Sequence, residues 1–272
     1  MNYEIDYEAW SAPKTFGFSG CFRLRNESQF MEAAIRSHLP WLDEAVLVVQ
    51  PSKDDTTERA YRMAGEDRRI KVHEYPFECD WIDTPGFYAK DPDAPGHMVH
   101  MSNWAFTKCR YSWIVKVEGD VIATSTFADI VERVQAQPDK YIYYGRVVLN
   151  MAGEMCDMVS WDNPRNGGWD EAVVPNNPAY HFKRQDKWEV LQNPGEGISM
   201  GWSGLHMKRC KRGKTDGWNG ETYIPFTREG VRSALAHFNR HKMSYPAADD
   251  PLGAECIYEG NWIEWYLKNL SA

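Results

Sequence analysis

Two acidic residues, Glu118 and Asp120, follow an apolar run and are separated only by Gly119. The run, residues 113–117, is short and rich in β-branched side chains, which predicts a buried strand and not a helix. Open α/β sheets carry their functional groups at the carboxyl ends of strands, and residues i and i+2 of an extended chain point the same way. Two converging carboxylates need a cation, and oxygen ligands favour Mg²⁺ or Mn²⁺. The alternative is a solvated turn, since acidic turns around a glycine are common.

The composition is that of a folded globular protein. With 272 residues, of which 43% are hydrophobic, the chain can hold one large α/β domain. The net charge of -8 argues against wholesale polyanion binding, although a local basic patch remains compatible with it. Six scattered cysteines without a Cys-x-x-Cys pair favour a reducing compartment. Because no signal peptide or membrane span is visible, we expect a cytoplasmic protein.

The first 150 residues alternate apolar strands with amphipathic helices. Strands are expected over residues 14–24, 45–49, 70–75 and 113–117. Helices are expected before Pro40, over 55–63, over 98–109 and from about residue 125. Asn26 or Ser28 is expected to cap the first helix, and Asp55 with Glu58 to form a capping box for the second. This alternation predicts a parallel, doubly wound α/β sheet.

The second half has a looser pattern. Short strands are expected over residues 141–144, 146–149, 188–191 and 201–208, an aromatic-rich functional loop over 161–177, and helices over 221–244 and 261–270. A dense basic run, Lys208-Arg209 with Lys211, Arg212 and Lys214, is either a solvated loop or a site for a diphosphate or an anionic acceptor.

Four motifs in chain order resemble those of family 2 glycosyltransferases of the GT-A fold. They are Arg25-Asn26-Glu27, Ser52-Lys53-Asp54-Asp55-Thr56, Asn103 and Glu118-Gly119-Asp120. The first two resemble the family's Arg-Asn-Glu motif and its Ser-x-Asp-x-Thr turn. The third matches a recurring Asn, and the last stands where the family has its DxD metal motif. The resemblance covers roughly residues 16–150.

The resemblance implies a GT-A-like (Rossmann-like), mostly parallel central sheet flanked by helices, in a single domain. Residues 14–150 would bind the nucleotide sugar, and residues 151–272 would form the acceptor-binding half with C-terminal helices. The implied reaction is a metal-dependent, inverting transfer of a sugar from a nucleotide sugar, most simply a UDP-sugar, with Mn²⁺ or Mg²⁺ as cofactor. The implied donor-binding residues are Arg23, Arg25, Asn26, Glu27, Gln50, Ser52, Asp54, Asn103 and Glu118.

The sequence departs from the family pattern at two positions. Gln50 replaces the Asp that usually contacts the nucleotide, so recognition of the base or ribose is expected to differ. Glu118 replaces the first Asp of the metal motif, and its longer side chain can still reach a ribose hydroxyl or a metal-bound water. Asp120 is then the direct metal ligand implied by the resemblance.

The resemblance also implies a metal-binding His and a catalytic base. His206 is the implied His of the metal shell, although a His on an apolar strand is often a satisfied core residue. His181 is the competing candidate, and His97 with His100 are interpreted as structural. The base that takes the acceptor proton would be Asp170 first and Glu171 second. A weaker candidate for the base is the pair Asp249-Asp250. The non-catalytic alternative for each of these acids is a solvated loop carboxylate.

The acceptor is left open by the sequence. Trp161, Trp169 and Trp202 are candidate stacking faces for it. A saccharide, a lipid-linked sugar or a hydroxylated base of DNA would all fit. Two other classes compete with a glycosyltransferase: a nucleotidyltransferase, although no Gly-rich, Lys-bearing phosphate loop is present, and a catalytically silent module that binds nucleotides or sugars.

Overall fold

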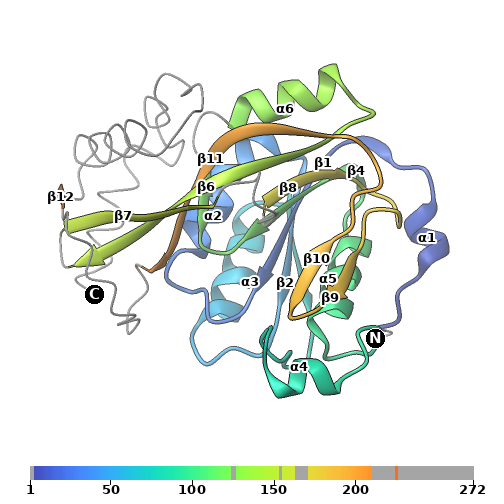
Figure 1. The fold of residues 1–272 in the computed structure, drawn as a ribbon, viewed down its shortest axis with the longest axis horizontal. Helices are drawn as coiled ribbons and strands as arrows, with labels where there is room; N and C mark the ends of the chain where they lie inside the picture. Colours follow the sequence, from blue (N-terminus) through green and yellow to red (C-terminus); the bar gives the residue numbers. More distant parts are fainter. Residues whose placement is uncertain (1–2, 124–126, 153–154, 163–170, 210–223, 226–272) are drawn as a thin grey trace.

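The computed structural model of the chain describes residues 3–123, 127–152, 155–162, 171–209 and 224–225 (Figure 1). A large sheet of ten strands forms its centre, and a separate two-stranded hairpin packs beside it. Within the described part of the chain, no helix combines the length and the apolar composition that crossing a membrane requires.

Four parallel strands form one side of the sheet, in the order β3-β2-β1-β4. They are β1 (Thr15–Leu24), β2 (Glu44–Val49), β3 (Ile70–Glu74) and β4 (Tyr111–Glu118). All six residues of β2 are buried, as expected of a strand covered on both faces. The four strands predicted in this part of the sequence are therefore confirmed.

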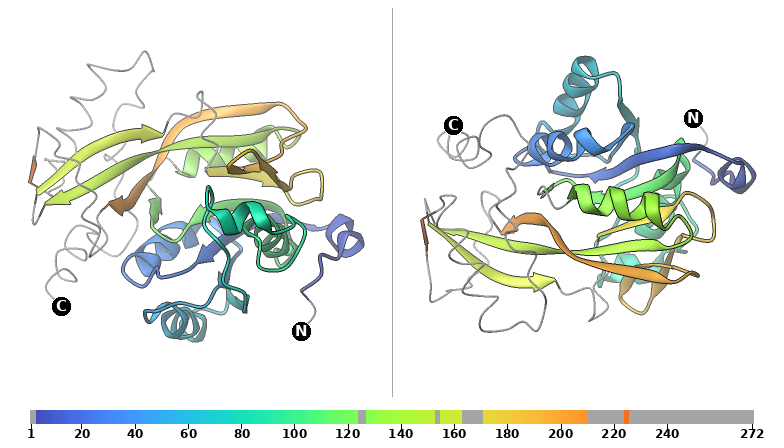
Figure 2. Two further views of the ribbon diagram at one scale, coloured as in Figure 1. Left: turned by 60° about the horizontal axis from the view of Figure 1, so that its bottom comes forward. Right: turned by 90° about the horizontal axis from the view of Figure 1, so that it is seen from above.

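Helices cover both faces of these strands (Figure 2). They are α2 (Met31–His38), α3 (Thr56–Glu66) and α6 (Phe127–Ala136) on one face and α5 (Met98–Thr107) on the other. Successive side chains of a strand point to opposite faces of the sheet. Leu47 therefore packs in the hydrophobic cluster with α2 and α3, and Val48 packs in the cluster with α5. The predicted α/β sheet flanked by helices is confirmed.

The rest of the sheet has mixed strand directions. It contains β5 (Val121–Ala123), β6 (Tyr141–Ala152), β7 (Met155–Asp162), β8 (Glu171–Pro175), β11 (Gly197–Arg209) and β12 (Ile224–Pro225). β8 lies antiparallel between β4 and β6. β8 and then β7 pair along one edge of β6, while β11 runs parallel to β6 along its other edge. The paired ends of β6 and β7 reach away from the parallel strands (Figures 1 and 2).

Smaller elements complete the described fold. They are α1 (Tyr7–Ser11), the 3₁₀ helix η1 (Leu39–Trp41), α4 (Pro85–Ala89) and the hairpin of β9 (Phe182–Gln185) and β10 (Trp188–Leu191). The hairpin shares a core with α5, since Phe182 and Leu191 pack in the same cluster as Trp104. The strand predicted over 188–191 is thus confirmed.

The cap predicted for the first helix is wrong, and the cap predicted for the second is correct in position but not in its hydrogen bond. The residue before α2 is Phe30, which makes no side-chain cap. Asn26 has a φ of 55° and belongs to the loop before the helix. Asp55 does stand at the N-cap of α3, but its carboxylate bonds to Arg59 (2.8 Å) and not to the helix backbone. The neighbouring Asp54 accepts the hydrogen bond from the first-turn backbone instead. Loop contacts engage Asn26, and the ion pair with Arg59, four residues on, engages the Asp55 carboxylate.

Three predictions in the second half need correction. The two strands predicted over 141–149 are one continuous strand, β6. The loop predicted over 161–177 contains the end of β7 and all of β8. The helix predicted from residue 221 is contradicted at β12, which pairs with β7; residues 226–244 and the helix over 261–270 lie outside the described residues. Strand pairing with distant residues overrides the local pattern in each case.

Candidate functional site

The acidic motif lies where the parallel strands give way to the mixed strands. β4 ends at Glu118, the chain turns through Gly119 and Asp120, and β5 follows directly. β5 pairs with β11 so that Val121 is opposite His206, and the Met207 N–H donates to the Asp120 carbonyl (2.9 Å). Backbone pairing, and not proximity in sequence, therefore brings His206 to the motif.

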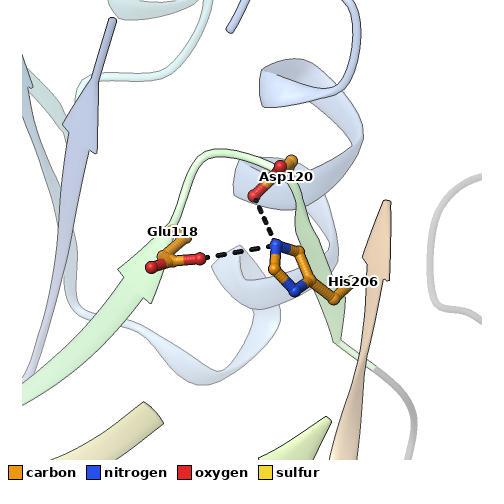
Figure 3. A group of neighbouring side chains, drawn as sticks. All are labelled: Glu118, Asp120 and His206. Atoms are coloured by element: carbon orange, nitrogen blue, oxygen red, sulfur yellow. Dashed lines mark ion pairs between the residues drawn. The ribbon is translucent and has the colours of Figure 1, made fainter. Parts of the chain in front are cut away.

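Three side chains converge at this junction (Figure 3). His206 Nε2 lies 3.5 Å from Glu118 Oε2 and 3.4 Å from Asp120 Oδ1. One ligand atom from each residue lies within 4.8 Å of the others, and no other group of three such residues is this close among those that the structure describes. Two carboxylates and an imidazole suit Mn²⁺, and Mg²⁺ with added water.

The chemistry of His206 fits a metal ligand. Its side chain is 2% exposed, and neither ring nitrogen has a hydrogen-bond partner in the part of the chain that the structure describes. A buried polar atom without a partner costs free energy. An ion held by Nε2 would supply that partner while neutralising two carboxylates. The donor set present therefore fits a divalent cation.

The packing around the motif favours glycine at position 119. A Cβ atom at this position would lie 2.6 Å from Leu24 Cδ2 and 3.0 Å from Glu27 Cγ. The loop after β1 thus presses directly on the turn that carries the two carboxylates. This close approach explains why the residue between them has no side chain.

Arg146 on β6 is part of the site, and sequence reasoning did not identify it. Its Nη1 donates to Glu118 Oε2 (2.7 Å) and to Glu171 Oε1 (2.9 Å). Burial would raise the pKa of Glu118, but the positive charges of Arg146 and Lys116 lower it overall. Glu118 is therefore a carboxylate. The available signal was Arg146 itself, a charged residue within an otherwise apolar strand sequence.

Arg23 lies next to the motif in the sheet but bonds elsewhere. It is in register with Glu118 on β4, yet its Nη1 pairs with Glu189 of β10 (2.6 Å) and bonds to Ser102. Its guanidinium also lies over the Phe182 ring, 5.3 Å from the centroid. Arg23 thus links the β9–β10 hairpin to the strand ends.

Several predicted donor-binding residues tie two loops together. Asn26 Oδ1 accepts from the Lys53 N–H (2.7 Å), and Ser52 Oγ accepts from the Asn26 N–H (3.1 Å). Asp54 accepts from the Ser28 N–H (3.1 Å). These side chains hold the loops after β1 and β2 against each other at the carboxyl edge of the sheet. Their contacts with a donor stay predictions.

Gln50 and Asn103 also have structural partners. Gln50 Oε1 accepts from the Cys79 N–H (3.2 Å), which fixes the chain beyond β3. Asn103 bonds to both backbone groups of Phe182, accepting from its N–H (2.7 Å) and donating to its carbonyl (3.0 Å). Asn103 therefore clasps the β9–β10 hairpin to α5, and a donor contact by either residue remains a prediction.

A cleft opens beside these loops. It has a volume of about 450 Å³ and is lined by the segment after β3, including Asp80 and Trp81, and by Arg25 from the end of β1. The Trp81 side chain is 58% exposed. The Arg25 guanidinium lies over its ring (5.4 Å) and donates to the Cys79 carbonyl (2.7 Å). An exposed indole face with a cation beside it can stack against a planar base.

Some of the remaining candidates have structural partners, and others lie outside the part of the chain that the structure describes. His97 Nδ1 accepts from the Val99 N–H (3.0 Å) at the start of α5, and His100 Nδ1 bonds to Tyr75 Oη (2.9 Å). These contacts agree with the structural interpretation of both residues. Residues that lie outside the described part of the chain are Asp170, Trp169, Asp249, Asp250, Lys211, Arg212 and Lys214. Trp161 lies on β7, whereas Trp202, Lys208 and Arg209 lie on β11.

No protein-family model matches the sequence, and no curated protein matches it either. Among solved structures, the chain is similar to S. aureus TarS, with a TM-score of 0.46 and 11% identity over 84% of this chain and 40% of that one. It is also similar to glucosyl-3-phosphoglycerate synthase from Mycobacterium tuberculosis in complex with Mn²⁺, UDP and glucosyl-3-phosphoglycerate. There the TM-score is 0.36 and the identity 18%, over 52% of this chain and 47% of that one. This chain spans less than half the length of either protein.

Proposed function

We propose that the chain is a metal-dependent glycosyltransferase with a GT-A-like fold in a single domain, which moves a sugar from a nucleotide sugar to an acceptor hydroxyl. The observation that carries the proposal is the convergence of Glu118, Asp120 and His206 at the carboxyl end of the parallel strands. Ligands of open α/β sheets bind at such strand ends. Three of the four motifs that resemble family 2 glycosyltransferases follow the ends of β1, β2 and β4 in the chain, which supports the proposal.

In this proposal Asp120 and His206 hold Mn²⁺ or Mg²⁺ directly, and Glu118 completes the set or reaches the ribose. The bound ion would supply positive charge to the leaving diphosphate. The cleft beside Trp81 and Arg25 receives the base, which we propose to be the uracil of a UDP-sugar. The indole face stacks on the base, and the tied loops after β1 and β2 keep the cleft in place.

We assign the catalytic base of an inverting reaction to Asp170. Glu171, the second candidate, is 1% exposed and paired with Arg146, so its carboxylate is committed to a buried contact at the start of β8. A base must lie within hydrogen-bond reach of the acceptor hydroxyl. Asp170 directly precedes that strand in the sequence, and we keep it as the first candidate for the base.

The acceptor that we propose is a saccharide hydroxyl, with a hydroxylated base of DNA as the second acceptor to test. Transfer to DNA should weaken steeply with salt, because its backbone binds through counterion release. Transfer to a neutral saccharide should not. An acceptor panel run at two salt concentrations separates the two.

The proposal is tested with a panel of nucleotide sugars, with and without Mn²⁺. Wild-type protein should gain thermal stability from one donor only when Mn²⁺ is present, and should release nucleoside diphosphate from it. Asp120→Ala should lose both effects, whereas Asp67→Ala, which removes a surface ion pair with Arg69, should keep them.

Metal-independent stabilisation by every donor would contradict the proposal, and so would the absence of any stabilisation. Donor binding without turnover would favour a silent binding module. Release of pyrophosphate from a nucleoside triphosphate would favour a nucleotidyltransferase.

A further inference from the structure

Arg146 joins two carboxylates through a single nitrogen. Its Nη1 lies 2.7 Å from Glu118 Oε2 and 2.9 Å from Glu171 Oε1. The Arg146 side chain is 5% exposed, so the guanidinium is withdrawn from solvent. Charge-assisted contacts of this kind are stronger when buried than at a surface.

The sheet fixes the place of Arg146. β6 pairs with β8 up to Tyr144, opposite Glu171, and then with β7 from Arg146, opposite Asp162. On its other edge Arg146 is opposite Gly204 of β11, two residues before His206. Arg146 therefore lies between β8, which contributes Glu171, and β11, which contributes His206, and its backbone has neighbours on both sides.

The oxygen of Glu118 that Arg146 holds is also the oxygen that faces His206. Glu118 Oε2 accepts from Arg146 Nη1 and lies 3.5 Å from His206 Nε2. A divalent ion between His206 and the two carboxylates would take the same oxygen as a ligand. The guanidinium and the ion therefore compete for Glu118, and like charges at this separation also repel each other.

We propose that Arg146 is a positioning residue that holds Glu118 and Glu171 together and lowers the metal affinity of the site by competing for Glu118. The inference rests on the metal-dependent function proposed above. In the metal-free protein Arg146 neutralises the buried carboxylates, which would otherwise repel each other. A metal ion has to displace or share the contact between Arg146 and Glu118. The metal affinity of the site is therefore lower than the same three ligands would have without Arg146.

The test is a titration of the full chain with Mn²⁺ in the absence of nucleotide, followed by electron paramagnetic resonance of free Mn²⁺. Arg146→Met keeps much of the side-chain volume and removes the charge. It should lower the melting temperature of the metal-free protein and lower the Kd for Mn²⁺ about tenfold, because the competing cation is gone. A merely structural role predicts the opposite sign for Kd, since a damaged site binds metal less tightly.

Three further variants control the experiment. Arg146→Lys retains the positive charge and should keep Kd close to that of the wild type. Arg110→Met removes a guanidinium from the buried Glu44 at the start of β2, and should lower the melting temperature without changing Kd. Glu171→Gln removes one of the two carboxylates that Arg146 Nη1 contacts, and with it a negative charge, so it should raise Kd. This variant also decides the matter if Arg146→Met does not fold.

Equal or weaker Mn²⁺ binding by Arg146→Met overturns the inference, as does an unchanged or lowered Kd in Glu171→Gln. If the wild type binds Mn²⁺ and transfers sugar, either of these outcomes overturns only the proposed role of Arg146 and leaves the proposed function standing. A wild-type protein that binds no Mn²⁺ overturns the proposed function and this inference together.

Discussion

The strands on the two sides of β4 contribute different things to the molecule. On one side, β1, β2 and β3 run parallel to β4, and nearly all their buried side chains are apolar. On the other side, β8, β6 and β11 run in mixed directions and bring Glu171, Arg146 and His206 into the interior. We refer to these as the parallel side and the mixed side.

The difference has an energetic meaning. Apolar burial on the parallel side stabilises the fold without specifying any chemistry. Charged groups on the mixed side are costly to bury and are held only because they neutralise one another. Glu118 lies on the boundary, supplied by a parallel strand and neutralised by a mixed one. We infer that the parallel side sets stability and the mixed side sets the properties of the site.

Removing a large core side chain from the parallel side should have the largest effect on stability. Phe22 is fully buried on β1 and packs edge-on against His38. Phe22→Ala should cost about 3–5 kcal/mol in the free energy of unfolding, measured with urea. The Kd for Mn²⁺ of the folded protein should not change; a change in proportion to the lost stability would remove the distinction between the two sides.

The Asn103 clasp joins α5, which covers the parallel side, to the β9–β10 hairpin, so its loss should be smaller but still large. Asn103→Ala leaves the Phe182 N–H and carbonyl without their partner, which should cost about 2–3 kcal/mol. Urea unfolding measures this loss. A drop in UDP affinity at unchanged stability would show instead that the side chain acts as a donor ligand.

His38 should make the parallel side sensitive to acid. Burial lowers its pKa from 6.5 to about 4, partly offset by a hydrogen bond to the Ala34 carbonyl. Because the unfolded chain then binds the proton more readily, stability is full above about pH 6.5 and falls as pH drops towards 4. Between pH 7 and pH 5 the loss should be about 2 kcal/mol.

The matched variant for this measurement is His38→Phe, which keeps a ring between Phe22 and Phe127. Subtracting its urea-derived curve from that of the wild type isolates the His38 contribution. Parallel curves for the two proteins would show that His38 does not cause the acid sensitivity.

The smallest stability change is expected at the boundary itself. Gly119→Ala places a Cβ against Leu24 and Glu27 and should cost about 1–2 kcal/mol. Since the same turn carries Glu118 and Asp120, Mn²⁺ affinity should fall together with stability, unlike in Phe22→Ala. Unfolding and Mn²⁺ titrations on the same preparation compare the two losses, and an unchanged Kd would show that the turn tolerates the shift.

The sequence predicted the parallel side well because its signals are local. The strands from β1 to β4 and the helices α2, α3 and α5 follow from apolar runs and helical spacing. His206 was reached by resemblance, and its position beside Asp120 follows from pairing of β5 with β11, which no local pattern shows. Arg146 was missed for the same reason, since Glu118 and Glu171, which it contacts, lie on other strands.

The local sequence also did not predict the hydrogen-bond partners of the motif residues. Asn26, Ser52 and Asp54 belong to two recognisable motifs, yet their side chains join two loops in the structure. A motif predicts where such residues lie, whereas their partners depend on how distant segments meet. The part of the helix expected over 221–244 that follows β12, and the helix expected over 261–270, lie outside the described residues and stay predictions.

The most direct test of a metal site built from both sides is Mn²⁺ binding by the wild type and by His206→Ala, followed by electron paramagnetic resonance. We expect one Mn²⁺ per wild-type chain and a Kd at least about tenfold higher in His206→Ala, with His73→Ala, on β3, as an unchanged control. No Mn²⁺ binding by the wild type, or equal affinity in His206→Ala, would contradict the account.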